Sequence, residues 1–243
     1  MQITFVLPTY NEAENLPKLV SALVSLPLPT LKILVADDNS PDGTGAIAEQ
    51  LAQAHPGRIS VLHRAGKEGL GRAYLHGFQV ALAQGADVVG QMDSDFSHPP
   101  EKIPEMAAAI EKYDVVMGSR YTKGGAVDKD WPVWRKGLSA FGNFYARTIL
   151  GIPVRDVTGG FRLYRRTTLE GMPLHRIRSN GYVFQVELAY LGHLSGFRAY
   201  EVPIYFADRR FGESKMSLRI QLEAALRVWQ VKIAYQDLTA KKR

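Results

Sequence analysis

The sequence predicts an α/β protein with a mostly parallel central sheet and helices on both faces. Between residues 3 and 119, short apolar runs of strand length alternate with longer segments whose apolar residues recur at helical spacing. Such alternation is typical of a parallel sheet that is covered on both sides. A length of 243 residues and a hydrophobic content of 46% suffice for one such domain with a large core.

The first half of the chain supplies most of this pattern. In the first expected helix, for example, Leu16, Leu19 and Leu23 fall on one helical face. The expected strands are residues 3–7, 31–36, 59–63, 88–92 and 115–118, and the expected helices between them are residues 12–26, 44–54, 69–84 and 102–112.

The pattern changes after Tyr121. A glycine-rich loop leads to aromatic and basic residues and then to a helix that ends at Leu150. The remaining expected elements are a helix at residues 183–194, a strand at 199–206 and one long helix at 217–240.

Composition excludes several classes of site. The chain contains no cysteine, which rules out disulfides, thiolate nucleophiles and cysteine zinc sites. It starts without the basic and apolar stretches of a signal peptide, and no apolar run approaches the roughly 18 residues of a membrane span. We therefore expect a soluble cytoplasmic protein. The formal net charge of +6 favours an anionic substrate, an anionic membrane surface or a nucleic acid as partner.

Asp93 and Asp95 form the most informative pair. They follow the apolar run that ends at Met92 and precede two prolines, so they lie where a buried strand ends. A turn there can bring both carboxylates to one cation, and hard oxygen ligands suit Mg²⁺ or Mn²⁺ holding a phosphate. For this motif alone, the alternative is a solvated acidic turn.

Polar clusters also follow three other expected strands. Residues 8–12 follow the first strand, residues 37–43 the second and residues 119–121 the fifth. Because ligands bind outside the carboxyl ends of the strands in open α/β sheets, four clusters on one edge favour a ligand site. Each cluster also has a structural alternative, such as helix capping by Asn11 or turn chemistry after the second strand.

These loops resemble motifs of the family 2 glycosyltransferases, which have the Rossmann-like GT-A fold. Three later segments narrow the resemblance to the dolichol-phosphate mannosyltransferase branch, also called polyprenol monophosphomannose synthases. The match keeps one register from about residue 3 to about residue 215. The motifs are LPTYNE at 7–12, DDNSPDGT at 37–44, DSDFSHP at 93–99 and GSRY at 118–121, then DVTGGFRLY at 156–164, GYVFQVE at 181–187 and GESK at 212–215.

The resemblance implies GDP-mannose as the sugar donor and a polyprenyl or dolichyl phosphate as the acceptor. Tyr10 would stack on the base, and Glu12 would accept a hydrogen bond from its amino edge. The residues that match the nucleoside pocket are Pro8, Tyr10, Glu12, Ala36 and Asp38.

The same resemblance implies a metal and diphosphate site at Asp93, Ser94 and Asp95, with Asp95 the principal ligand of Mg²⁺ or Mn²⁺. A cation there would offset diphosphate charge and stabilise the leaving GDP. Ser97 stands where some relatives have a glutamine ligand; because serine is shorter, it is a weak candidate that would act through water. Ser94 and Gly160 replace a commoner alanine and serine, and we expect neither change to abolish activity.

Cationic side chains complete the implied site. Arg209 and Lys215 match contacts to the donor phosphates, in a loop that would close over the donor; the alternative is a solvated basic loop. Arg120, Arg135 and Ser139 match positions that grip the acceptor phosphate, and the arginine fork suits a phosphate. Together with the metal ligand, the cations at 120, 209 and 215 are the residues we expect to contact the donor and to be catalytic.

The acceptor itself favours a mechanism without a general base. A phosphate monoester has a second pKa of about 6, so it is largely anionic at pH 7. We expect a single in-line displacement that inverts the anomeric carbon. Glu187 lies roughly where enzymes with hydroxyl acceptors carry a base, and we interpret it as structural or orienting.

Two segments are candidates for contact with a lipid surface. For the last helix, the alternative is packing on the sheet. We expect residues 1–215 to form the catalytic domain and residues 216–243 a C-terminal amphipathic helix, attached peripherally to the cytoplasmic face of the membrane or to a membrane partner subunit. The first segment contains Trp131, Trp134, Leu138, Phe141, Phe144 and Tyr145 beside Arg135, Lys136 and Arg147, and the second contains Leu218, Leu222, Ala225, Leu226, Trp229 and Ile233.

Three other functions compete with this interpretation. The donor could be UDP-glucose with the same kind of acceptor, although the motifs at 181–187 and 212–215 favour mannose. The acidic edge could instead belong to a nucleotidyltransferase or a phosphohydrolase. A non-catalytic nucleotide-binding or nucleic-acid module is disfavoured, because the basic residues do not form one stripe.

Overall fold

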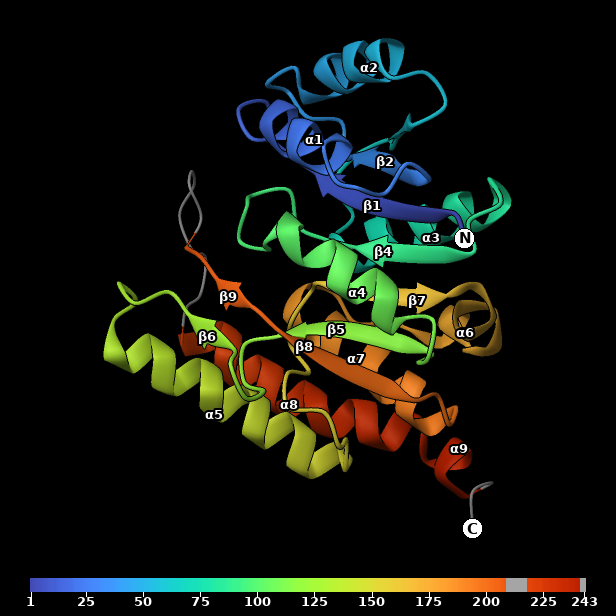
Figure 1. The fold of residues 1–243 in the computed structure, drawn as a ribbon. Coiled ribbons are helices and arrows are strands. Elements are labelled where there is room, and N and C mark those ends of the chain that lie inside the picture. Colours follow the sequence, from blue (N-terminus) through green and yellow to red (C-terminus); the bar gives the residue numbers. More distant parts are fainter. Residues whose placement is uncertain (209–217, 241–243) are drawn as a thin grey trace.

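The computed structural model describes residues 1–208 and 218–240 of the chain (Figure 1). A seven-stranded sheet with the order β3-β2-β1-β4-β7-β5-β8 lies at its centre. Neighbouring strands are parallel except at β7, which runs antiparallel to β4 and β5. The strands are β1 (Ile3–Thr9), β2 (Leu31–Asp37), β3 (Ile59–His63), β4 (Val88–Gln91), β5 (Val115–Ser119), β7 (Arg162–Arg165) and β8 (Ala199–Pro203), and a second sheet pairs β6 (Ala126–Val127) with β9 (Tyr205–Phe206).

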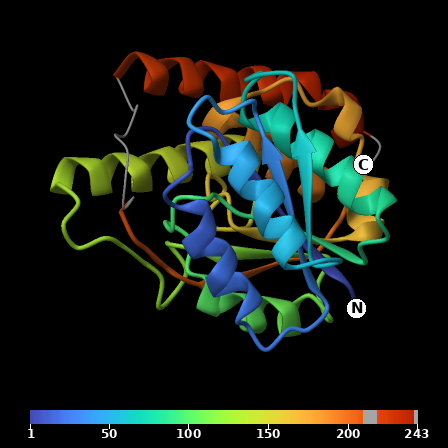
Figure 2. The same cartoon turned by 90° about the horizontal axis from the view of Figure 1, so that it is seen from above.

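Helices cover both faces of the sheet, as the alternation along the chain predicts (Figures 1 and 2). One face carries α1 (Leu16–Val24), α2 (Thr44–Ala54) and α4 (Ile103–Ala109). The other carries α3 (Leu70–Ala83), α5 (Val133–Leu150), α6 (Arg166–Gly171), α7 (Gly181–Leu194) and α8 (Leu218–Ala234). The short elements are α9 (Gln236–Ala240) and the 3₁₀ helices at Pro100–Lys102 and Leu174–Arg176.

Two apolar cores follow from the pleat of the strands. Along β1, Phe5 and Leu7 enter the core beneath α1, α2 and α4, whereas Val6 enters the core on the opposite face. All three side chains are fully buried. A strand that is buried on both faces reads as a continuous apolar run, which is why these strands were predictable.

The strand order places a topological switch point between β1 and β4. From β1 the chain moves outward to β2 and β3, and then it returns to form β4 on the other side of β1. Open α/β sheets bind ligands at the carboxyl ends of the strands on either side of such a point. Residues 10–12 and 92–97 leave β1 and β4 there.

Strand β7 was not predicted, because it does not look apolar. It is four residues long, with arginine at each end. Arg162 is nevertheless buried, since its guanidinium donates to the carbonyl oxygens of Val157, Gly159 and Gln185 at 2.8–3.0 Å. A buried cation whose hydrogen bonds are satisfied gives no hydrophobic pattern to read.

The prediction of one continuous helix over residues 217–240 is wrong. Among the described residues, α8 ends at Ala234, before the separate helix α9. Tyr235 between them is buried and donates its hydroxyl to Glu187 Oε1 at 2.7 Å. Arg176 donates to the carbonyl oxygen of Ala234 at 2.7 Å. These contacts come from distant parts of the chain, so the local pattern does not show the break.

Helices α5 and α8 lie side by side at one end of the sheet (Figures 1 and 2). Trp229 Nε1 donates to the Tyr145 hydroxyl at 3.1 Å, and that hydroxyl donates to the Ala225 carbonyl oxygen at 3.3 Å. Val228 and Val231 are buried in the core that α7 also lines. Within residues 1–208 and 218–240, no helix has the length and apolar character needed to cross a membrane. The expected domain boundary at residue 215 lies outside the described residues.

Candidate active site

Hydrogen bonds join the end of β1 and the loops that follow β1, β2 and β4. Ser94 Oγ donates to the carbonyl oxygen of Pro8 at 3.1 Å, which joins the loop after β4 to the end of β1 across the switch point. The backbone N–H of Asn11 donates to Ser40 Oγ at 3.1 Å. Three of the polar clusters expected from the sequence thus form one continuous surface.

Backbone strain is concentrated in these same loops. Asn11, Asn39 and Phe96 have φ of 61°, 58° and 63°, and they are the non-glycine residues with positive φ in the described part of the chain. Asparagine tolerates this conformation, but for phenylalanine it costs about 1–2 kcal/mol. Because strain of this kind clusters at functional sites, Phe96 marks the acidic loop of residues 93–97 as a candidate site.

Asp95 is buried and held by its own loop. The Ser97 hydroxyl donates to Asp95 Oδ1 at 2.6 Å, and the Ser97 backbone N–H donates to the same oxygen at 3.1 Å. Ser97 is itself buried. In this arrangement Ser97 orients the Asp95 carboxylate, a role that differs from the weak metal ligand expected from the sequence.

Asp93 is held from two other directions. The Tyr74 hydroxyl of α3 donates to Asp93 Oδ1 at 3.1 Å, and the Asp93 backbone N–H donates to His98 Nδ1 at 3.1 Å. His98 stacks on Phe161 with ring centroids 5.2 Å apart. Burial lowers the pKa of His98, so the ring is neutral at pH 7 and can accept this bond.

The acidic loop fits a divalent cation that shares its oxygens with a phosphate. Asp93 and Asp95 supply carboxylate oxygens, the donor type that Mg²⁺ and Mn²⁺ prefer. Within the described residues, no three histidine, aspartate or glutamate side chains form a metal-binding group. A cation at this loop would therefore need oxygens from a diphosphate or from water to complete its coordination, as Mg²⁺ commonly does.

The expected nucleoside pocket is only partly assembled from side chains. Tyr10 is exposed on the loop after β1, and Lys67 Nζ lies 4.0 Å from the centroid of its ring. Glu12 accepts a hydrogen bond from Asn15 Nδ2 at 2.8 Å. Ala36 is fully buried in the core, so its methyl group packs within the domain. A base that stacks on this face of Tyr10 must displace Lys67.

Asp38 is buried in an ion pair with Arg64, and Arg64 also donates to Glu68 at 2.8 Å. Burial raises the pKa of Asp38, and the charge of Arg64 opposes this rise. Neither Arg64 nor Lys67 was predicted. Both follow β3, so the strand-end argument used for the other loops would have identified them.

Arg120 is fully engaged with the loop before β7. Its Nε and Nη2 donate to the two carboxylate oxygens of Asp156, both at 2.7 Å, and Nη2 also donates to Thr158 Oγ1 at 2.7 Å. Burial raises the pKa of Asp156, but the charge and hydrogen bonds of Arg120 more than offset it and leave that pKa below its ordinary value. The structure thus gives Arg120 a role in holding this loop, which the sequence did not suggest.

Arg135 and Ser139 lie together on α5. Arg135 pairs with Asp208 at 3.1 Å and places its guanidinium 3.7 Å from the ring centroid of Trp131. Ser139 Oγ accepts a hydrogen bond from the Tyr121 hydroxyl at 2.7 Å. The expected donor contacts Arg209 and Lys215 lie outside the described residues.

Glu187 is buried behind the site and is satisfied by two protein donors. Its Oε2 accepts the backbone N–H of Ser179 at 2.9 Å, and its Oε1 accepts the Tyr235 hydroxyl. The carboxylate lines a cavity of about 570 Å³ between α7 and α8, together with Arg178 and Arg227. These contacts fit the structural interpretation of Glu187.

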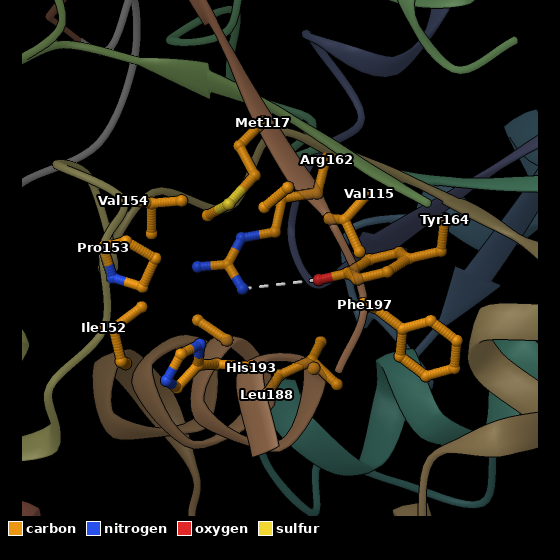
Figure 3. Close-up of a pocket in the computed structure, with 13 residues that line it drawn as sticks. Val115, Met117, Ile152, Pro153, Val154, Arg162, Tyr164, Leu188, His193 and Phe197 are labelled. Atoms are coloured by element: carbon orange, nitrogen blue, oxygen red, sulfur yellow. Dashed lines mark hydrogen bonds between the residues drawn. The ribbon is translucent and has the colours of Figure 1, made fainter. Parts of the chain in front are cut away.

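A second cavity lies between the sheet and α7 (Figure 3). It measures about 60 Å³ and is lined mainly by apolar side chains from β5, α7 and residues 152–154. Arg162 projects into it and donates to the Tyr164 hydroxyl at 3.3 Å (Figure 3). Ligand pockets usually measure about 300–1,000 Å³, so this cavity is too small for a nucleotide sugar.

Comparison with known families identifies the chain. The model of the family described as "Glycosyl transferase family 2" matches residues 4–172. The chain belongs to glycosyl transferase family 2. The match covers β1 to α6, and it includes the acidic loop and both partners of the Arg120–Asp156 pair.

Two relatives are similar to this chain over most of its length. Polyprenol monophosphomannose synthase of Mycolicibacterium smegmatis is 47% identical over 213 residues, which cover 87% of this chain and 80% of that protein. Undecaprenyl-phosphate mannosyltransferase of Micrococcus luteus is 42% identical over 243 residues, which cover 99% of each chain.

Solved structures confirm the GT-A fold. Glucosyl-3-phosphoglycerate synthase from Mycobacterium tuberculosis, in complex with Mn²⁺, UDP and glucosyl-3-phosphoglycerate, aligns with a TM-score of 0.62. The alignment covers 95% of this chain and 78% of that one at 18% identity. At this identity the likeness shows the fold alone, and it confirms the mostly parallel sheet with helices on both sides.

Proposed function

We propose that this family 2 glycosyltransferase transfers mannose from GDP-mannose to a polyprenyl phosphate. The observation that carries the proposal is the 42% identity with undecaprenyl-phosphate mannosyltransferase over 99% of both chains. The position of the acidic loop at the topological switch point supports it, because a nucleotide sugar would bind there.

The donor diphosphate would lie beside the acidic loop. Asp93 and Asp95 would hold Mg²⁺ or Mn²⁺ together with diphosphate oxygens, and Ser97 would fix the orientation of Asp95. When bound, the cation neutralises charge on the leaving GDP. Tyr10, Glu12 and Asp38 would contact the nucleoside, with Arg209 and Lys215 as the proposed donor cations.

The acceptor phosphate would enter from the side of α5. Arg135 and Ser139 lie on that helix, and Arg135 is partly exposed. An oxygen of the lipid phosphate attacks the anomeric carbon of mannose, and the bond from that carbon to the GDP oxygen breaks. GDP leaves with the electron pair, and the configuration at the carbon inverts. The attacking oxygen is already anionic at pH 7, so no side chain has to remove a proton.

A lipid acceptor needs the protein at a membrane surface. On α5, Trp134, Phe141 and Phe144 are exposed, whereas Trp131 is buried and does not belong to this surface. On α8, Leu226, Trp229 and Ile233 are exposed. Large apolar side chains on two adjacent helices, beside basic residues, suit interfacial binding. We propose that this face lies on the cytoplasmic surface of a membrane.

The direct test is an assay of the purified chain with labelled GDP-mannose and undecaprenyl phosphate. We expect labelled mannose to enter the lipid fraction with release of one GDP per transfer. EDTA should abolish the transfer, and added Mg²⁺ or Mn²⁺ should restore it.

Other outcomes of the same assay would contradict the proposal. A higher kcat/KM with UDP-glucose would favour the glucosyl alternative. Lipid-independent release of sugar phosphate or diphosphate would indicate a phosphohydrolase or a nucleotidyltransferase.

A further inference from the structure

The side-chain amide of Gln185 is an incompletely paired polar group close to the acidic loop. Gln185 lies on α7 and is only 2% exposed. Its Oε1 accepts a hydrogen bond from Gln91 Nε2 at 2.6 Å. Its Nε2 has no hydrogen-bond partner within the described part of the chain. Because an unpaired buried N–H is costly, a group outside the protein is expected to accept this bond.

Gly160 leaves room beside this amide. A Cβ atom at position 160 would lie 3.3 Å from Gln185 Nε2, 3.5 Å from Asp93 Oδ1 and 3.5 Å from His98 Cε1. These side chains come from α7 and from the loop after β4, and they surround a space of roughly methyl size. A hydrogen-bond donor and an acceptor thus face the same space.

The neighbours of the amide fix its orientation. The Asp93 carboxylate attracts an N–H group and repels an amide oxygen, so Nε2 faces Asp93 and Oε1 faces Gln91. Exchanging the two atoms of Gln185 would set its NH₂ group against that of Gln91. The negative charge of Asp93 therefore makes Gln185 present a hydrogen-bond donor to the space beside Gly160.

A hydroxyl group in this space can form hydrogen bonds with both Gln185 and Asp93. It can accept from Gln185 Nε2 and donate to Asp93 Oδ1 at the same time. Asp93 Oδ1 already accepts from the Tyr74 hydroxyl at 3.1 Å, and a carboxylate oxygen can accept a second bond. A bare phosphate oxygen would meet the charge of Asp93, and an apolar group would leave the amide unpaired.

We propose that Gly160, Gln185 and Asp93 form a subsite that binds one hydroxyl of the transferred sugar. The inference rests on the proposed function, because the sugar is attached to the diphosphate that we place at the acidic loop. The subsite would bind the sugar of the donor and leave the affinity for the nucleotide alone unaffected.

The test fills the space with a methyl group. Gly160→Ala adds a Cβ that would lie 3.3 Å from Gln185 Nε2 and 3.5 Å from Asp93 Oδ1, so the Gln185 amide has to shift by a few tenths of an ångström. Gly192→Ala is the matched control, since the same change on α7 meets only Met172 Sδ at 3.7 Å. Calorimetry measures the Kd of GDP-mannose and of GDP for each purified protein, and steady-state transfer gives KM and kcat.

We expect Gly160→Ala to raise the Kd and KM for GDP-mannose about tenfold, because the sugar loses one hydrogen bond to a charged network. The Kd for GDP should stay within about twofold of the wild-type value. The control should match wild type. A GDP-mannose analogue that lacks the bound hydroxyl should show no difference between wild type and Gly160→Ala.

A second variant covers the case in which the first does not fold. Replacing both Gln91 and Gln185 by methionine removes the pair of amides without leaving either one unpaired, a change that is nearly neutral for stability. This double variant should also bind GDP-mannose more weakly and keep the wild-type affinity for GDP.

Unchanged GDP-mannose affinity in both variants would overturn the subsite and indicate that the space holds a structural water. A parallel loss of GDP affinity would also overturn it, because the change would then act through the diphosphate site. Failure of the proposed function would look different: the wild-type protein itself would not transfer mannose.

Discussion

Asp95 owes its orientation to a residue two positions further along the chain. Ser97 donates both its hydroxyl and its backbone N–H to Asp95 Oδ1, which holds the carboxylate in one orientation. Outer partners of this kind commonly change metal affinity or activity about 10–100-fold when they are removed. We therefore expect Ser97 to affect metal binding without being a ligand itself.

Substituting Ser97 by alanine should weaken metal activation. We expect the concentration of Mn²⁺ that gives half-maximal transfer to rise about tenfold or more, since Asp95 loses the bond that fixes it. The measurement is a titration of transfer activity with Mn²⁺ after EDTA treatment. Ser60→Ala, on β3 and away from the acidic loop, is the control and should behave as wild type. An unchanged midpoint in Ser97→Ala would contradict this role.

Loss of the ion pair between Arg120 and Asp156 should change how the free energy of unfolding depends on pH. In wild type the pKa of Asp156 lies below its ordinary value, so the pair stabilises the fold above about pH 4 and loses this contribution as the pH falls. Burial is the largest influence on that pKa, so we expect it to raise the pKa of Asp156 once the Arg120 side chain is removed. The folded state would then bind a proton more tightly than the unfolded state, and stability would fall as the pH rises.

Arg120→Gln should therefore be destabilised more at pH 8 than at pH 5. We expect a loss of about 3–5 kcal/mol in the free energy of unfolding at pH 8, the usual cost of leaving a buried charge unpaired. Urea unfolding of both proteins at the two pH values measures it. A loss that is equal at both pH values would show that Asp156 does not titrate in the variant.

At the scale of elements, the sequence predicts those whose apolar pattern is local. The bounds of α2 and β3 are confirmed to the residue, and most others are confirmed to within a few residues at each end. The antiparallel strand β7 and the break at Tyr235 were not predictable, because each depends on hydrogen bonds to residues far away in the chain. In the site, the sequence indicates which loops meet, but it cannot show that Arg120 is occupied by Asp156 or that Lys67 covers Tyr10.

Tyr235 ties the junction of α8 and α9 to Glu187 on α7. Tyr235→Phe removes the hydroxyl that donates to buried Glu187, so one carboxylate oxygen loses a partner. We expect a loss of about 1–3 kcal/mol in the free energy of unfolding, measured with urea, and transfer activity within about threefold of wild type. A large loss of transfer activity with unchanged stability would contradict this structural role and would indicate that the junction takes part in catalysis.

At the scale of the whole molecule, the exposed apolar side chains gather on α5 and α8, which lie side by side (Figures 1 and 2). Seven exposed apolar side chains lie on the described parts of these two helices, each between 48% and 85% exposed: Val133, Trp134, Phe141, Phe144, Leu226, Trp229 and Ile233. Burying a large apolar side chain in a lipid interface contributes about 1.5–3 kcal/mol. This face is therefore the part of the surface most suited to a bilayer.

Replacing Leu226 and Ile233 together by serine should weaken membrane binding at least about tenfold. The measurement is co-sedimentation with vesicles that contain phosphatidylglycerol. Tyr200→Ser, an exposed side chain on β8, is the matched control and should bind as wild type does. Equal binding of all three proteins would exclude α8 from the membrane contact.

We propose that transfer at the acidic loop needs no general base. Comparing Asp95→Ala with Glu187→Gln in one purified assay tests it most directly, with circular dichroism to confirm that both variants fold. We expect Asp95→Ala to lose nearly all transfer of mannose to polyprenyl phosphate. Glu187→Gln should keep a substantial part of kcat, because the Glu187 carboxylate accepts hydrogen bonds from Ser179 and Tyr235. Equal losses of activity in two folded variants would contradict a mechanism without a general base and would indicate that Glu187 is catalytic.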